Sequence, residues 1–194
     1  MSGDIRVTKK ALLGIALGAI IVAITGVLLG NWFVGWRAEA DEAEIFSKHF
    51  DRLGTLRKGM QPPAVELTDL DGNVVSLRDI VAGKNTVILL LSIGCDPCTD
   101  AVERWRDFKD DLPPDLHVIG INNGDCTGVS EYIAETKMPY PVYCDADHSL
   151  PLNYDMNQFP SIMGISQNGT IAFLGPGVFA GFTPQDAMEL IQSR

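Results

Sequence analysis

Two cysteines separated by two residues lie between an apolar run and a segment with helical periodicity. The run Thr86–Ser92 carries no charge and does not alternate with polar residues, which predicts a strand covered on both faces. Cys95-Asp96-Pro97-Cys98 follows three residues later. The next apolar residues recur at steps of three and four and predict a helix with one buried face: Ala101, Val102, Trp105, Phe108 and Leu112. This order of strand, cysteine pair and helix is typical of a redox site.

Thiol chemistry explains the spacing of the pair. A thiolate attacks a disulfide sulfur, and a second thiol close by must then displace the partner from the mixed disulfide. We expect Cys95 to attack and Cys98 to resolve, because the amino end of the helix stabilises a thiolate at Cys95. Gly94, Asp96 and Pro97 complete the expected redox loop, with Pro97 in the first turn, where no N–H is needed.

Two other interpretations of the pair stay open. A structural zinc site needs a second close pair, whereas the other cysteines, Cys126 and Cys144, are widely separated in the sequence, so we expect no metal. A purely structural Cys95–Cys98 bond closes so short a loop that it constrains the unfolded chain little.

The N-terminal part of the chain predicts a membrane anchor over residues 11–34, after a cytoplasmic segment at 1–10. Residues 11–30 contain no charged side chain, and about 20 apolar residues span a bilayer. Three basic residues precede the run, and Trp32 and Trp36 follow it as an aromatic belt, which orients the rest of the chain outside the cytoplasm. A cleaved signal peptide ending near Ala38-Glu39-Ala40 is the alternative. Two Gly-x-x-x-Gly pairs also allow two anchors to dimerise.

The charge of the chain excludes some partners. Residues 1–37 carry four basic side chains and one acidic side chain, a net charge of +3, so the chain total of −10 leaves −13 on residues 38–194. A domain this acidic repels nucleic acid. We therefore expect protein partners and a lipid bilayer around the anchor, with no nucleic acid.

Residues 35–58 read as a juxtamembrane helix or stalk, because apolar residues up to Leu53 and Leu56 trace one side of a helix. The globular domain is expected over 59–194, with an Asp71-Gly72 hairpin and a helix at 77–81 before the central strand. Further elements follow it: a strand at 116–122, a helix near 127–136, a strand near 141–144, a hairpin at Asn168-Gly169 and a last helix after Thr183.

This order resembles the α/β thioredoxin-like fold of the TlpA/ResA-like membrane-anchored thiol-disulfide oxidoreductases. Such a fold has a central mixed sheet flanked by helices, an N-terminal β-hairpin and a central insertion. The stretches that carry the resemblance are residues 59–67 (GMQPPAVEL), the Asp71-Gly72 turn, Cys95-Asp96-Pro97-Cys98 and Phe159-Pro160. The resemblance implies a cis Pro160 beside the cysteines, with Phe159 and Pro160 shaping the groove for a client protein, and it implies no cofactor.

The chain departs from its relatives at two positions near the cysteines. Gly94 stands where the family commonly has tryptophan, and Leu89 stands where thioredoxins have a buried acid. Asp96 is a third local feature, since a carboxylate beside Cys95 opposes the thiolate that the helix favours. A less stabilised thiolate makes a more reducing couple, so we expect a reductase rather than a disulfide donor.

Cys126 follows the strand expected at 116–122, and Cys144 ends the strand expected near 141–144. Their thiols can meet if those two strands are neighbours. Outside the cytoplasm an even number of cysteines favours pairing. A stabilising disulfide, a redox relay and free thiols stay open as their roles.

The sequence thus predicts an anchored, periplasmic enzyme that reduces or exchanges disulfides in client proteins, supplied with electrons by a membrane or periplasmic donor. Cytochrome c maturation enters only through the resemblance. Two rival functions remain. One is a peroxiredoxin-like peroxidase, since Ser92 and Cys95 match part of that site although Ile88 stands where its proline would be. The other is a non-catalytic, membrane-tethered binding or assembly module.

Overall fold

The computed structural model describes residues 22–27, 29–30, 51–177 and 181–193, and it divides into two compact units at residues 1–47 and 48–194. In the first unit, residues 22–27 and 29–30 are helical and exposed. Among the described residues, no helix combines the length and the apolar character that crossing a bilayer requires. The expected anchor at 11–34 lies mostly outside the described residues.

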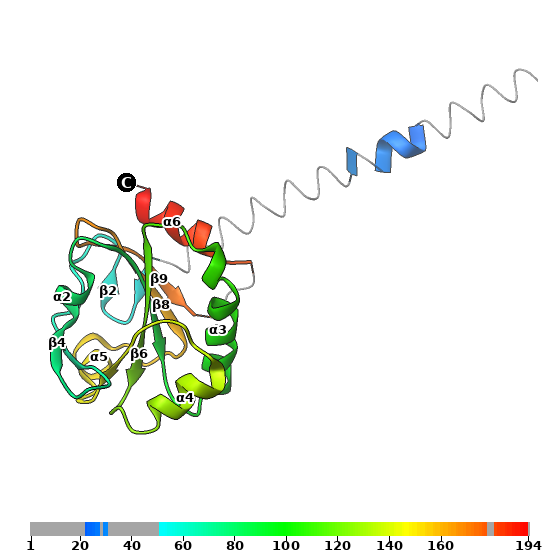
Figure 1. Cartoon of the computed structure of the whole chain (residues 1–194). Helices are drawn as coiled ribbons and strands as arrows, with labels where there is room; N and C mark the ends of the chain where they lie inside the picture. The colour runs from blue at the N-terminus through cyan, green and yellow to red at the C-terminus, as the bar shows by residue number, and fades with distance from the viewer. Residues whose placement is uncertain (1–21, 28, 31–50, 178–180, 194) are drawn as a thin grey trace, which may run out of the picture. The chain divides into compact units, whose positions relative to one another are not determined.

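A seven-stranded mixed sheet forms the centre of the second unit, in the order β4-β3-β7-β6-β5-β8-β9 (Figure 1). β5, β6 and β7 are parallel, and the strands on either side of these three are antiparallel to their neighbours. The strands are β3 (Glu66–Thr68), β4 (Val74–Ser76), β5 (Asn85–Leu91), β6 (Leu116–Asn123), β7 (Val142–Asp145), β8 (Ser161–Ile165) and β9 (Ile171–Pro176). This arrangement is the predicted α/β fold with a central mixed sheet.

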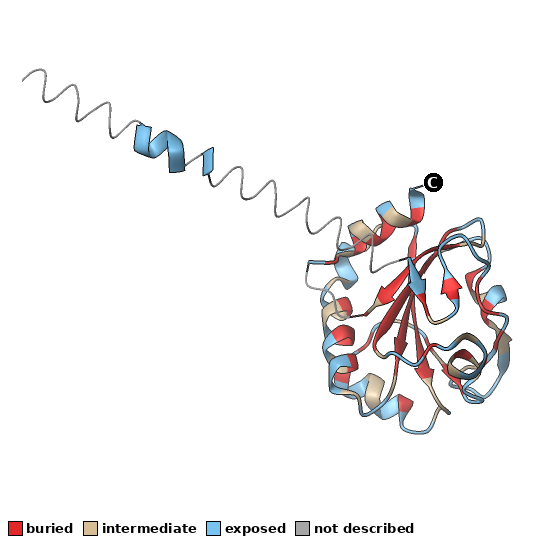
Figure 2. Ribbon diagram, turned by 180° about the vertical axis from the view of Figure 1, so that it is seen from behind, coloured by how far each residue is buried: buried red, intermediate tan, exposed pale blue. Residues whose placement is uncertain are grey.

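Helices cover the sheet. They are α2 (Leu77–Val81), α3 (Asp96–Asp107), the 3₁₀ turn η1 (Lys109–Asp111), α4 (Val129–Thr136), α5 (Ser149–Tyr154) and α6 (Pro184–Gln192). α6 has the expected cap, because the Thr183 side chain accepts from the Asp186 N–H and the Asp186 carboxylate accepts from the Thr183 N–H. Figure 2 shows burial concentrated in the strands and on the inward sides of the helices.

β5 is buried from Thr86 to Leu91, as its continuous apolar sequence predicts. Ile88 and Leu90 belong to a core that also takes side chains from α2 and α5. An aromatic cluster lies around α3, where Phe182 packs 6.4 Å from Trp105 and 5.6 Å from Phe173 between ring centroids. The strand that leads to Cys95 is therefore fixed on both faces.

The predicted helix over residues 35–58 is wrong for residues 51–58, and residues 35–50 lie outside the described residues. Residues 51–58 contain the two-stranded hairpin of β1 (Arg52–Leu53) and β2 (Leu56–Arg57). Gly54 turns the chain with φ +57°, so Leu53 and Leu56 pair across the hairpin and both are buried. Leu53 and Leu56 are three residues apart, a spacing that also fits one face of a helix, and for this reason the sequence indicated a helix here.

Two other elements differ from expectation. α3 ends at Asp107 and η1 takes up residues 109–111, so the helix does not reach Leu112 as an α-helix. At Asn168-Gly169 only the glycine has a positive φ, +80°, whereas the expected type I′ turn needs a positive φ at both residues.

Candidate active site

Cys95 is held between the end of β5 and the start of α3. Its N–H donates to the Ser92 carbonyl at 3.3 Å, which closes the turn after the strand. Gly94 lies in this turn with φ +80°, a conformation that residues with a side chain rarely adopt. The chain thus has glycine, where the family commonly has tryptophan, at a position whose positive φ favours glycine.

Cys95 is the N-cap of α3 and is bonded to Cys98 in a disulfide with a Cα–Cα separation of 5.2 Å. The Cys98 N–H donates to the Cys95 carbonyl at 3.0 Å and lies 3.3 Å from Cys95 Sγ. Cys98 is fully buried, whereas Cys95 is half-buried. Cys95 is thus the more accessible residue of the pair, as the roles of attacker and resolver require.

α3 is held against the sheet by its predicted face. Ala101, Val102 and Trp105 are buried, whereas Glu103 and Asp107 are exposed. This packing fixes the amino end of the helix, and with it the backbone N–H groups that face Cys95.

Phe159 and Pro160 lie at the edge of the sheet where β5 ends. The bond between them is cis, as the resemblance implies. Ser161 pairs with Leu90 in the antiparallel β5–β8 ladder, so Pro160 falls opposite the end of β5, on the side from which the Cys95 loop leaves. Phe159 is half-buried and packs against the core.

Leu89 is 1% exposed within β5, so an apolar side chain occupies the position of the acid in thioredoxins. Tyr132 of α4 is another titratable group near the redox helix. Burial raises the pKa of Tyr132, and contact with Thr99, the residue after Cys98, opposes part of that rise. Its hydroxyl is buried and makes no hydrogen bond in the part of the chain that the structure describes.

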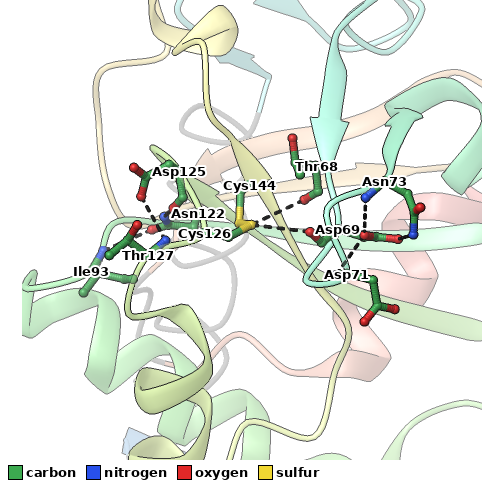
Figure 3. The surroundings of a disulfide bond; sticks show 10 residues. All are labelled: Thr68, Asp69, Asp71, Asn73, Ile93, Asn122, Asp125, Cys126, Thr127 and Cys144. Carbon is green, nitrogen blue, oxygen red and sulfur yellow. Dashed lines mark hydrogen bonds between the residues drawn. A yellow bond between two sulfur atoms is a disulfide. The ribbon is translucent and has the colours of Figure 1, made fainter.

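The structure joins Cys126 and Cys144 in a second disulfide, with a Cα–Cα separation of 5.5 Å. β6 and β7 are parallel neighbours, and Asn122 pairs with Cys144 across them. Cys126 follows the end of β6, so this bond lies at the same edge of the sheet as the Cys95 loop (Figure 3). The sequence condition for pairing, that the two strands be neighbours, is met.

Asn122 is a residue whose role sequence reasoning missed. It is 6% exposed, accepts from the Ile93 N–H at 3.2 Å through Oδ1 and donates to the Asp125 carbonyl at 2.9 Å through Nδ2. One buried amide therefore links the loop before Cys95 to the loop before Cys126. The signal that could have found it is an amide side chain at the end of a mostly apolar strand.

Within residues 22–27, 29–30, 51–177 and 181–193, no cluster of three or more histidine, cysteine or acidic residues is placed to hold a metal ion. The chemistry available at this edge is that of the two cysteine pairs.

A cysteine pair at the amino end of a helix, opposite a cis-proline on a mixed sheet, defines a thioredoxin-like redox protein. Residues 59–174 match the AhpC/TSA family, so the chain belongs to that family. The thiol-disulfide oxidoreductase YkuV of Bacillus subtilis is 24% identical over 128 residues, which cover 61% of this chain and 86% of the relative.

Solved structures agree on the fold. One is described as a thiol:disulfide interchange protein DsbE of Chlorobium tepidum, with a TM-score of 0.53 and 22% identity over 71% of this chain and 94% of that chain. The thioredoxin domain of a thiol-disulfide oxidoreductase from Bacteroides vulgatus matches with a TM-score of 0.53 and 22% identity, covering 71% of this chain and 96% of that chain. The predicted class, a thioredoxin-like thiol-disulfide oxidoreductase, is confirmed.

Proposed function

We propose that the protein is a membrane-anchored, extracytoplasmic thiol-disulfide oxidoreductase of the TlpA/ResA-like type that reduces disulfides in client proteins through Cys95 and Cys98. The observation that carries the proposal is the asymmetry of this pair. Cys95 is half-buried at the amino end of α3, and Cys98 is fully buried behind it.

The reaction follows from that asymmetry. The Cys95 thiolate attacks one sulfur of a client disulfide, so that a Cys95–client bond forms and one client thiolate leaves. Cys98 then attacks Cys95 Sγ, and the second client thiolate leaves as the Cys95–Cys98 disulfide closes. The client gains two electrons and two protons, and the pair loses them. Because Leu89 supplies no carboxylate, water at the half-buried Cys95 or a more distant acid has to serve in proton exchange.

Several features of the surface suit a polypeptide client. Ile93 is 38% exposed directly before the redox turn, and Gly94 carries no side chain that would screen Cys95. Pro160 is itself buried, and its carbonyl accepts from the Gly177 N–H at 2.9 Å, so Ile93 and Gly94 are the exposed part of this surface. A client chain thus meets a low apolar surface beside Cys95, in place of the bulky flank that tryptophan gives relatives.

The location is proposed from the sequence. The proposal is supported by the apolar run over 11–34, the basic residues before it and the aromatic residues after it, a pattern typical of an anchor whose following domain lies outside the cytoplasm. Electrons then come from a membrane or periplasmic dithiol donor, because cytosolic reductants do not cross the bilayer. Accessibility of cysteines engineered into residues 1–10 and into the domain, measured with a membrane-impermeant thiol reagent in intact cells, tests this orientation. Labelling of the N-terminal site alone would contradict it.

The direction of electron flow is proposed from Asp96. It lies exposed in the first turn of α3, directly after Cys95, where its negative charge opposes a thiolate. The charge makes the reduced pair less stable and shifts the couple toward a reductant.

Client trapping tests the function. In Cys98→Ser the resolving thiol is absent, so mixed disulfides between Cys95 and clients accumulate and can be identified after non-reducing separation. The matched control is Cys95→Ser, which keeps Cys98 but loses the attacking sulfur and traps nothing. Two results would contradict the proposal: peroxide consumption by Cys98→Ser without trapped protein, which indicates a peroxidase, or an unchanged phenotype in Cys95→Ser, which indicates a tethered binding module.

A further inference from the structure

The second disulfide has the same asymmetry as the first. Cys144 is fully buried at the end of β7, whereas Cys126 is half-buried in the loop after β6. A reagent in solution therefore reaches this bond through Cys126. A disulfide with one partly exposed cysteine is one that a thiolate can attack at that end, because exchange depends on access.

The surroundings of Cys126 suit a reduced thiol. Its Sγ lies 3.7 Å from the Thr68 carbonyl oxygen and 3.6 Å from the Asp69 carbonyl oxygen (Figure 3). A disulfide sulfur has no hydrogen to donate, but the thiol formed on reduction does, and two acceptors already face it. The same oxygens disfavour a thiolate, so Cys126 is suited to receive an attack and not to make one.

The two disulfides are connected through Asn122. Its amide accepts from Ile93, two residues before Cys95, and donates to Asp125, one residue before Cys126. The loop at Asp125 is further fixed by the Thr127 N–H, which donates to the Asp125 carboxylate at 2.9 Å. One side chain thus gives the Cys126 loop a hydrogen-bonded link to the Cys95 loop.

We propose that Cys126–Cys144 is a second redox-active disulfide, which accepts electrons from an external dithiol at Cys126 and transmits its state through Asn122 to the Cys95 loop. One thiolate of the reductant attacks Cys126 Sγ, forming a mixed disulfide and releasing Cys144. The second thiol of the reductant displaces Cys126. The chain gains two electrons and two protons, and the reductant leaves as a disulfide.

Native-state mass mapping tests the first half of the proposal. The full-length protein is equilibrated in defined mixtures of reduced and oxidised dithiothreitol, trapped with an alkylating reagent and digested. We expect both Cys126 and Cys144 to be labelled in folded protein, with Cys126 labelled first because Cys144 is buried. A Cys126–Cys144 bond that stays closed until the protein unfolds would overturn the proposal.

The same titration of Cys95→Ser/Cys98→Ser identifies the source of the electrons and separates this proposal from the function of the first pair. Equal reduction of Cys126–Cys144 in both proteins is expected for an external dithiol. Reduction only in the wild type would overturn the proposal, because the electrons would then come from Cys95.

The coupling through Asn122 has its own test. The equilibrium constant of the Cys95–Cys98 couple against dithiothreitol is compared between the wild type and Cys126→Ala/Cys144→Ala. We expect a change between about twofold and tenfold, the effect of one hydrogen bond. In an Asn122→Ala background the change should vanish. In the matched Asn123→Ala background, whose side chain contacts His148 at 3.1 Å, it should persist. No change in the wild-type background, or an equal change with Asn122→Ala, would overturn the coupling.

Discussion

Cys95–Cys98 and Cys126–Cys144 differ in what surrounds the half-buried sulfur. Cys95 caps a twelve-residue helix, and the Cys98 N–H donates to its sulfur at 3.3 Å, whereas the Cys126 sulfur faces two carbonyl oxygens. Donors stabilise a thiolate and acceptors stabilise a thiol. Two disulfides at one edge of a sheet are thus prepared for different steps, the first to attack and the second to be attacked. Half-exposure of a cysteine does not by itself make a nucleophile.

The largest effect expected from this difference is on turnover. Cys95→Ser should reduce the rate of disulfide reduction in a protein substrate to background. A serine hydroxyl does not ionise near neutral pH, so it cannot replace the thiolate as the nucleophile. Cys126→Ser should leave most of the rate, because Cys126 makes no attack. Rates measured with reduced full-length variants check this. A loss of turnover in Cys126→Ser as severe as in Cys95→Ser would contradict the claim that only Cys95 attacks the substrate.

The second effect concerns stability. The chain-entropy relation gives about 3 kcal/mol for a disulfide of the Cys126–Cys144 separation, 18 residues, and about 2 kcal/mol for the Cys95–Cys98 separation, 3 residues. Each pair joins one buried and one half-buried sulfur, so the two double alanine variants are matched controls for each other. Urea unfolding should show the larger loss for Cys126→Ala/Cys144→Ala. The reverse order would contradict a greater constraint by the second bond.

A smaller effect is expected at Tyr140, which ties the redox helix to the segment that enters β7. Its hydroxyl donates to the Trp105 carbonyl at 2.7 Å, and burial, with a contribution from Asp110, raises the pKa of Tyr140 to about 12. Tyr140→Phe should lower the free energy of unfolding by about 1 kcal/mol below pH 10.

The same hydroxyl predicts a pH dependence. Between pH 10 and about 12 the unfolded state has lost the Tyr140 proton that the folded state keeps, so stability falls as pH rises through this window. Unfolding measured at pH 9 and pH 11 should show a shallower fall in Tyr140→Phe. Tyr143→Phe, the same change on β7, is the control. An equal fall of the unfolding free energy with pH in the wild type and in Tyr140→Phe would contradict the assignment of this fall to the Tyr140 hydroxyl.

The smallest effect is at Asp96. Removing its charge should stabilise the Cys95 thiolate and make the couple more oxidising by about 5 to 20 mV, the equivalent of one charge at a helix end. Asp96→Asn is compared with Asp107→Asn at the far end of α3, which should leave the potential unchanged. A shift toward a more reducing potential in Asp96→Asn would contradict the electrostatic account.

The parts of the site set by local signals could be predicted from the sequence. The apolar run of β5 and the spacing of the helical face place Cys95 and Cys98 without reference to the rest of the chain. The capping residues Thr183 and Asp186 likewise mark the start of α6 directly.

The parts set by distant contacts could not be predicted. α5 was missed because its first N–H groups, at Ser149 and Leu150, are accepted by the carboxylate of Asp145 in β7 rather than by an adjacent cap. Asn122 was missed for the same reason, since its two partners lie on loops that only the folded sheet brings together. The residue pattern of one segment does not indicate hydrogen-bond partners that lie in a distant segment.

The reduction potential of the Cys95–Cys98 couple in the full-length protein tests the central claim most directly. The couple is titrated against a dithiol buffer and the pair is followed by mass mapping, so that the second disulfide does not contribute to the signal. An attacking pair that works as a reductant predicts a value near that of thioredoxin, about −270 mV. A value above about −180 mV, in the range of oxidants and isomerases, would contradict it.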